Sequence, residues 1–144
     1  MLLFAATMWV LARYCPLLTV IPDPWSRLGW CVMAYAPITP IMALIQFRRA
    51  QTTVNPHKPE DAMALVTTGV YAWTRNPMYL GLTVLLLGLA IKLGALSAFL
   101  GPLLFVPLIQ RFQIRPEEHA LRHKFGESYD QYCRRVNRWL GRRG

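Results

Sequence analysis

The sequence predicts an all-α polytopic membrane protein with about four transmembrane helices and a cytoplasmic amphipathic C-terminal helical tail. Hydrophobic residues make up 54% of its 144 residues, although the formal net charge is +9. The charges are clustered: Lys92 is the only charged side chain between Arg75 and Arg111, and none lies between Arg27 and Arg48. Long apolar runs between short charged blocks are typical of an integral membrane protein. They leave little chain for a soluble nucleic-acid-binding face.

Four apolar runs account for most of the chain. Two are expected to form transmembrane helices within residues 1–47 and two within residues 77–115. They run from Met1 to about Ile21, from Gly29 to Phe47, from Pro77 to Ile91 and from about Ala95 to Gln110. The length of the chain indicates one domain, so residues 1–144 are expected to form a single membrane-embedded unit.

Residues 48–76 form a polar loop between the second and third apolar runs. Turn-forming Asn-Pro and Lys-Pro pairs interrupt it at Asn55 and Lys58, which places the loop outside the bilayer. Most Lys and Arg residues lie in this loop and in the C-terminal tail, whereas the other two connections hold only Arg27 and Lys92. Because basic loops stay on the cytoplasmic side, both termini and the central loop are expected to be cytoplasmic.

The tail, residues 116–144, has the pattern of an amphipathic helix. Pro116 suits a first helical position, and Gly126 is expected to end one helix before a second begins near Glu127. Apolar and aromatic residues recur at spacings of three and four on one face: Leu121, Phe125, Tyr129, Tyr132, Val136 and Trp139. Taken alone, the pattern predicts a basic helix at the membrane surface.

The segment from Arg75 to Gly81 marks a helix that begins at the membrane boundary. Asn76 is a preferred N-cap, and Pro77 costs nothing at the first helical position. Free backbone N–H groups, the helix dipole and the charge of Arg75 together suit an anionic group. The alternative is a plain helix start that Arg75 anchors among the lipid headgroups.

The junction at the start of the tail is a second polar cluster on the same face. Arg111 and Arg115 are one helical turn apart, and so are Gln113 and Glu117. A helix that continued through Pro116 would bring guanidinium and carboxylate groups together. The alternative is a salt-bridge network at headgroup level, which would contribute little stability.

Neither metal ligation nor a disulfide framework is predicted. His119 and His123 lie beside Glu118 at a spacing of four, but the order is not HExxH and no third ligand is evident, so we expect no metal site. The three cysteines are far apart, outside any CxxC spacing.

Two motifs together resemble the isoprenylcysteine carboxyl methyltransferase and phospholipid methyltransferase superfamily. The first is Gly69-Val70-Tyr71 followed by Arg75-Asn76-Pro77-Met78-Tyr79-Leu80-Gly81. The second is Glu117-Glu118 followed by Leu121, Phe125-Gly126, Tyr129, Tyr132, Val136 and Arg138-Trp139. The resemblance covers about Thr52 to Trp139, and the two motifs occur in order, separated by two apolar helices.

The resemblance implies a single membrane-embedded domain that is an S-adenosylmethionine-dependent methyltransferase without a Rossmann fold. Its cofactor would lie on the cytoplasmic side, between the helix that begins at Pro77 and the tail. The resemblance places these residues at the cofactor: Tyr71, Arg75, Asn76, Pro77, Tyr79, Leu80, Gly81, Glu117 and Glu118, with Tyr129, Tyr132 and Arg135 as weaker candidates. An acidic methyl acceptor would need Arg111 or Arg115, whereas an amine would need Glu117 or Glu118 as its base.

Two departures from the family pattern bear on the methyl acceptor. Asn76 stands where many members carry His, which looks closer to phospholipid methyltransferases. Gln113 stands where carboxyl methyltransferases usually carry Arg. A lipid or another amphiphile is therefore the expected acceptor. The alternatives are a membrane reductase resembling the sterol reductases and a non-enzymatic membrane accessory protein.

Overall fold

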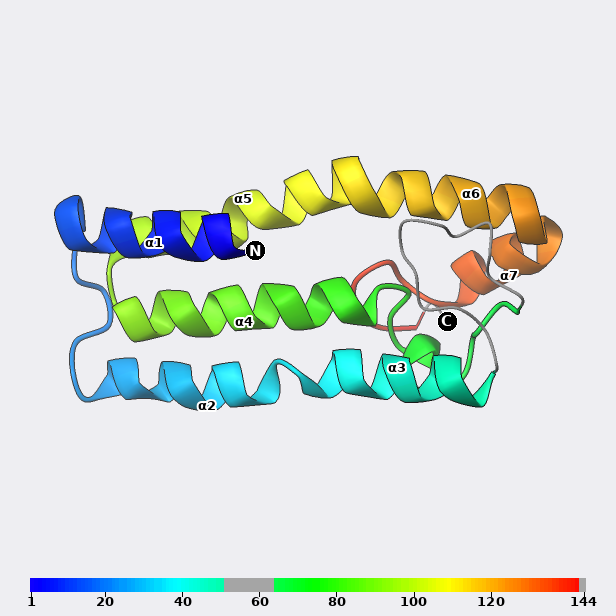
Figure 1. The fold of residues 1–144 in the computed structure, drawn as a ribbon, viewed down its shortest axis with the longest axis horizontal. Helices are drawn as coiled ribbons and strands as arrows, with labels where there is room; N and C mark the ends of the chain where they lie inside the picture. Colours follow the sequence, from blue (N-terminus) through cyan, green and yellow to red (C-terminus); the bar gives the residue numbers. More distant parts are fainter. Residues whose placement is uncertain (51–63, 143–144) are drawn as a thin grey trace. The chain divides into compact units, whose positions relative to one another are not determined.

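The computed structural model describes residues 1–50 and 64–142, and this part of the chain is helical (Figure 1). The chain divides into two compact units. The first consists of Met1–Ile38 and Gly81–Leu108, and the second of Thr39–Leu80 and Ile109–Gly144. The prediction of an all-α chain is confirmed for the described residues, in which the only β pairing is two isolated bridges.

Each predicted apolar run contains a helix. The α-helices are α1 (Leu2–Tyr14), α2 (Leu28–Tyr35), α3 (Ile38–Arg49), α4 (Pro77–Leu93), α5 (Leu100–Ile109), α6 (Arg115–Phe125) and α7 (Glu127–Arg135). Short 3-10 turns at Trp25–Arg27, Gly69–Ala72 and Leu96–Phe99 precede α2, α4 and α5, and a π-helical turn at Gln110–Ile114 joins α5 to α6.

Two helical stretches are long and apolar enough to cross a membrane: Trp25–Arg49, with 25 residues, and Leu96–Phe125, with 30. The other two apolar helices, α1 and α4, have 13 and 17 residues. A count of two candidate spans is thus established for the described residues, and the count of four stays a prediction.

The first helix is shorter than the sequence predicts, because it ends at Tyr14 rather than near Ile21. Pro16 has no backbone N–H and disfavours helical geometry at the preceding Cys15, whose φ is −143°. The chain beyond it is extended: Val20 and Ile21 donate backbone hydrogen bonds of 2.9 and 3.1 Å to the carbonyl of Gly94.

Close helix contacts in the first unit depend on glycine. A Cβ on Gly29 of α2 would lie 2.5 Å from the Gly88 carbonyl oxygen and 2.5 Å from the Lys92 nitrogen of α4. A Cβ on Gly101 of α5 would lie 2.1 Å from the sulfur of Met8 in α1. Such close approach of helices through small residues is common inside membranes.

The outer surface of the first unit is apolar. Large hydrophobic side chains are exposed on all four of its helices, among them Leu2, Leu3, Trp9, Trp30, Tyr35, Leu87 and Leu103. A soluble helical domain buries such side chains, so this exposure fits helices that face lipid.

The second unit has its own core, formed by Ala43, Val70, Tyr71, Tyr129, Tyr132 and Val136. Most of the aromatic stripe of the tail therefore packs against the chain itself. Gly126 ends α6 with a φ of +52°, as predicted. The stripe does not continue as a helix to Trp139, because α7 ends at Arg135 and Val136 pairs with Arg142 in a β-bridge.

The helix continues through Pro116, which the sequence left open. A proline ring clashes with the carbonyl four residues earlier, here that of Phe112, and lacks an N–H to donate. Residues 110–114 form a wider π-helical turn just before this point, and Pro116 lies in the first turn of α6. Trp139 fixes the π turn by donating a 3.1 Å hydrogen bond from Nε1 to Oε1 of Gln110.

Candidate functional site

The start of α4 is held by the C-terminal segment of the chain. The side-chain amide of Asn76 donates a 3.0 Å hydrogen bond to the Arg138 carbonyl, and its backbone N–H donates to Oγ1 of Thr74 at 3.1 Å. The backbone N–H of Arg75 donates to the Asn137 carbonyl at 3.2 Å. Asn76 therefore joins two distant segments as well as beginning a helix.

Glu118 is the centre of a charged cluster, the Arg75–Glu118–Arg138 cluster. Arg138 donates two hydrogen bonds to the carboxylate of Glu118, from Nε to Oε1 at 3.0 Å and from Nη2 to Oε2 at 2.6 Å. Nη2 of Arg75 lies 3.2 Å from Oε1, and the side chains of Arg75 and Glu118 are only 10% and 11% exposed. The hydrogen bonds that Arg138 donates to Glu118 raise the pKa of Arg138. The two guanidiniums compensate the buried charge of Glu118.

Arg75 has one donor left over. Its Nη1 contacts the sulfur of Cys133, but its buried Nε has no hydrogen-bond partner among the described residues. A buried donor without an acceptor is costly, so a ligand that supplied an acceptor here would be stabilised.

Glu117 has a different environment from Glu118. Its Oε2 accepts a 3.0 Å hydrogen bond from the hydroxyl of Tyr79, which also hydrogen-bonds the side chain of Gln113. Glu117 makes no ion pair within the described residues, and it is partly exposed. The first turn of α4 therefore contacts α6 through hydrogen bonds that join the carboxylate of Glu117, the phenol of Tyr79 and the amide of Gln113.

Three tyrosines among the predicted site residues belong to the core. Tyr71, Tyr129 and Tyr132 are 8%, 2% and 3% exposed, and the Tyr132 hydroxyl donates a 2.8 Å hydrogen bond to the Tyr71 carbonyl. Burial raises the pKa of all three phenols, so they stay neutral at physiological pH and cannot act as bases. All three pack together in the core of the second unit.

The remaining candidates are spread more widely. Arg111 and Arg115 are exposed, and neither forms an ion pair with Glu117 or Glu118 in the part of the chain that is described. Arg111 lies over the ring of Phe112 instead, 6.0 Å from its centre.

The first turn of α4 is largely enclosed. Pro77 is fully buried, Leu80 is half-buried and donates its N–H to the Asn76 carbonyl at 2.9 Å, and Gly81 belongs to the first unit.

Sequence reasoning did not assign a site role to Arg138. Its position, twenty residues after Glu118, follows no helical spacing. The signal that could have found it is a charge argument: a glutamate on the buried side of an amphipathic helix needs a cation, and the tail is rich in arginine.

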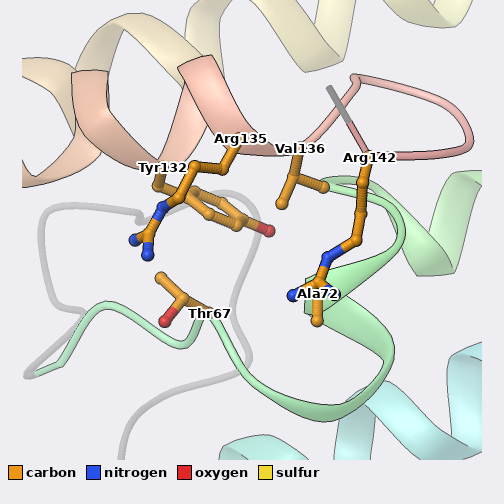
Figure 2. Close-up of a pocket in the computed structure, with 6 residues that line it drawn as sticks. All are labelled: Thr67, Ala72, Tyr132, Arg135, Val136 and Arg142. Carbon is orange, nitrogen blue, oxygen red and sulfur yellow. The ribbon is translucent and has the colours of Figure 1, made fainter. Parts of the chain in front are cut away.

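A small hollow lies in the second unit, lined by Thr67, Ala72, Tyr132, Arg135, Val136 and Arg142 (Figure 2). Its volume is about 60 Å³. Sites for whole cofactors occupy about 300–1,000 Å³, so this hollow is too small to hold a nucleoside cofactor.

Comparison with known proteins identifies the family. The family model described as phospholipid methyltransferase matches residues 25–128, which is more than half of the chain. The chain belongs to this family. The match includes the first motif and the beginning of the second, up to Gly126, and it stops before Tyr129 and the C-terminal segment that holds Arg138.

Curated relatives of this phospholipid methyltransferase family member include named enzymes. A protein-S-isoprenylcysteine O-methyltransferase of Schizosaccharomyces pombe is 34% identical over 97 residues, 65% of this chain and 40% of that protein. The human protein of the same name is 36% identical over 83 residues, 58% of this chain and 29% of that protein. An uncharacterized protein of Haemophilus influenzae is 44% identical over 63 residues, 44% of this chain and all of that protein.

The chain thus spans less than half the length of these two O-methyltransferases. No solved structure matches it.

Proposed function

We propose that this family member is a membrane-embedded methyltransferase that uses S-adenosylmethionine and acts on a lipid or another amphiphile. The 3.0 Å hydrogen bond between Tyr79 and Glu117 carries the proposal, because it joins two motifs 38 residues apart along the chain. The family match and the names of the relatives support methyl transfer. The apolar exterior of the first unit supports an acceptor that reaches the site from the membrane.

The donor set fits this cofactor. The unpartnered Nε of Arg75, beside the N-terminus of α4, suits the carboxylate of the amino acid part. The carboxylate of Glu117, which makes no ion pair among the described residues, suits a positive ammonium or sulfonium group. When bound, S-adenosylmethionine supplies a methyl carbon that its sulfonium has already activated.

The protein's own part in the reaction is then to align the acceptor, exclude water and take up a proton where the acceptor has one to lose. Glu117 is the group placed to accept that proton, with Tyr79 orienting its carboxylate. Glu118 is the weaker candidate base, because both of its oxygens already accept hydrogen bonds from Arg138. An amine acceptor therefore suits the site better than a carboxylate, because Glu117 can take up the proton that an amine loses.

Calorimetric titration of the detergent-purified chain tests the proposal. We expect S-adenosylhomocysteine to bind and NADPH not to bind. Glu117→Gln should weaken the binding of S-adenosylhomocysteine by about tenfold, the value of one hydrogen-bonded charge. Glu127→Gln is the matched control, since that acid lies on the exposed side of α7, paired with Arg134.

Binding of NADPH without S-adenosylhomocysteine would favour the reductase instead. Binding of neither would favour an accessory protein. If S-adenosylhomocysteine binds, incubation with labelled S-adenosylmethionine and membrane lipid extracts would identify the methyl acceptor.

A further inference from the structure

Two arginines line the small hollow of the second unit, and the proposed methyl transfer assigns no step to either of them. The resemblance places only Arg135 of the two at the cofactor, as a weaker candidate. Figure 2 shows two arginine side chains reaching into it from different segments, Arg135 from the end of α7 and Arg142 from the C-terminal segment. The Arg135 guanidinium points toward Thr67, and that of Arg142 lies beside Ala72.

The two guanidiniums have no acidic partner among residues 1–50 and 64–142. None of the six lining residues is acidic, and neither arginine forms an ion pair in the described part of the chain. The neighbouring Arg134, by contrast, pairs with Glu127, and Arg138 pairs with Glu118. Two like charges that share one hollow repel each other unless an anion lies between them.

Three of the side chains that line the hollow, those of Arg142, Tyr132 and Val136, have other contacts. The guanidinium of Arg142 lies over the ring of Trp73, 5.8 Å from its centre. The Tyr132 hydroxyl is committed to the Tyr71 carbonyl, and Val136 is buried in the core. The groups left to bind a ligand are therefore the two guanidiniums and the hydroxyl of Thr67.

We propose that this hollow binds a phosphate group, carried by a phospholipid headgroup or free in solution. Two planar guanidiniums approaching from different segments need an acceptor with oxygens on several sides, which a tetrahedral phosphate offers and a planar carboxylate does not. A hollow of about 60 Å³ suits one compact ionic group rather than a larger molecule. The proposal does not depend on methyl transfer, because none of its residues is among those that pair Tyr79 with Glu117.

The experiment uses the full chain purified in a non-ionic detergent. Inorganic phosphate, short-chain dihexanoyl phosphatidic acid and dihexanoyl phosphatidylcholine are titrated at constant ionic strength, with S-adenosylhomocysteine in parallel. Arg135→Gln and Arg142→Gln are compared with Arg134→Gln, which removes the same charge one residue outside the hollow. All three residues are exposed, so the unfolding temperature of each variant should match that of the unmodified chain.

We expect Arg135→Gln and Arg142→Gln each to weaken binding of the phosphate compound by about tenfold or more, and Arg134→Gln to change it less than about twofold. Binding of inorganic phosphate supports a general phosphate site, and binding of the lipids alone supports a headgroup site. Failure of all three phosphate compounds to bind would overturn the proposal. An equal loss of phosphate affinity in Arg134→Gln would also overturn the proposal, because it would show that the binding is non-specific charge attraction.

The titration with S-adenosylhomocysteine separates this site from the proposed methyl-transfer site. If the phosphate site is distinct, Arg142→Gln keeps the affinity of the unmodified chain for S-adenosylhomocysteine. A loss of that affinity in Arg142→Gln would assign the hollow to the cofactor and overturn a separate phosphate site. Phosphate binding in a chain that does not bind S-adenosylhomocysteine would retain this inference while removing the methyltransferase proposal.

Discussion

At the scale of single residues, two adjacent glutamates have separate tasks. Neighbouring residues on an α-helix point about 100° apart, so Glu117 and Glu118 cannot face the same partners. Glu118 is buried between Arg75 and Arg138, whereas Glu117 meets the phenol of Tyr79. The sequence presents the pair as one acidic motif. In the structure, Glu118 is held in ion pairs, whereas Glu117 forms none within the described residues and accepts a hydrogen bond from Tyr79.

This division predicts different effects of the same substitution. Glu118→Gln should lower the free energy of unfolding by about 3 kcal/mol, because it leaves Arg75 and Arg138 without their shared anion. Glu117→Gln should leave the unfolding temperature nearly unchanged. Thermal unfolding in detergent measures both effects, and equal stability of the two variants would contradict the assignment.

Arg138→Gln gives an independent check on the same cluster. It removes the bidentate partner of Glu118, so it should destabilise the chain by a similar amount. The double variant Glu118→Gln with Arg138→Gln should cost less than the sum of the two single changes, since the groups share one interaction. Additive losses would show that the two residues act separately.

At the scale of helices, close backbone contact between α2 and α4 is the feature most sensitive to a small change. Gly29→Ala would place a methyl group 2.5 Å from the Gly88 carbonyl, which forces the helices apart. We expect a loss of about 1–3 kcal/mol in the free energy of unfolding. Ala34→Val is the control, because it adds a larger volume at an exposed position of α2. Thermal unfolding should be affected by the first change and not by the second.

The helices show which features local sequence determines. Apolar runs predicted four helices, and Gly126 predicted the break between α6 and α7, because both signals act within a few residues. The end of α1 was misplaced, although Pro16 marked it. The non-helical path after Arg135 had no local signal. It depends on backbone hydrogen bonds to Trp73 and Arg75, some sixty residues earlier in the chain, which periodicity cannot reveal.

The candidate site was also predictable only in part, because some of its contacts depend on long-range pairing. The sequence predicted that the helix start and the tail acids converge, and both Tyr79–Glu117 and Arg75–Glu118 are contacts of this kind. It did not predict that Arg138 would also pair with Glu118, because long-range ion pairs follow no regular spacing in the sequence. The roles given to these residues at a cofactor stay predictions.

At the scale of the whole molecule, the uneven distribution of basic residues predicts orientation. Reporter fusions to the C-terminus should give a fluorescent green fluorescent protein and an inactive alkaline phosphatase, since we expect the basic tail to stay in the cytoplasm. A phosphatase fused after Gly94, in the connection that holds only Lys92, should be active. The opposite pattern would place the proposed site on the wrong side of the membrane for a cofactor made in the cytoplasm.

The path of the C-terminal segment has a consequence during synthesis. Glu118 leaves the ribosome about twenty residues before Arg138, and the carbonyl that Asn76 contacts belongs to that same late arginine. Until Arg138 emerges, Glu118 has no bidentate partner, and Asn76 at the start of α4 has no Arg138 carbonyl to bind. A chain that stops short of Asn137 therefore remains an incomplete fold, open to quality-control proteases, even though every apolar helix has already been made.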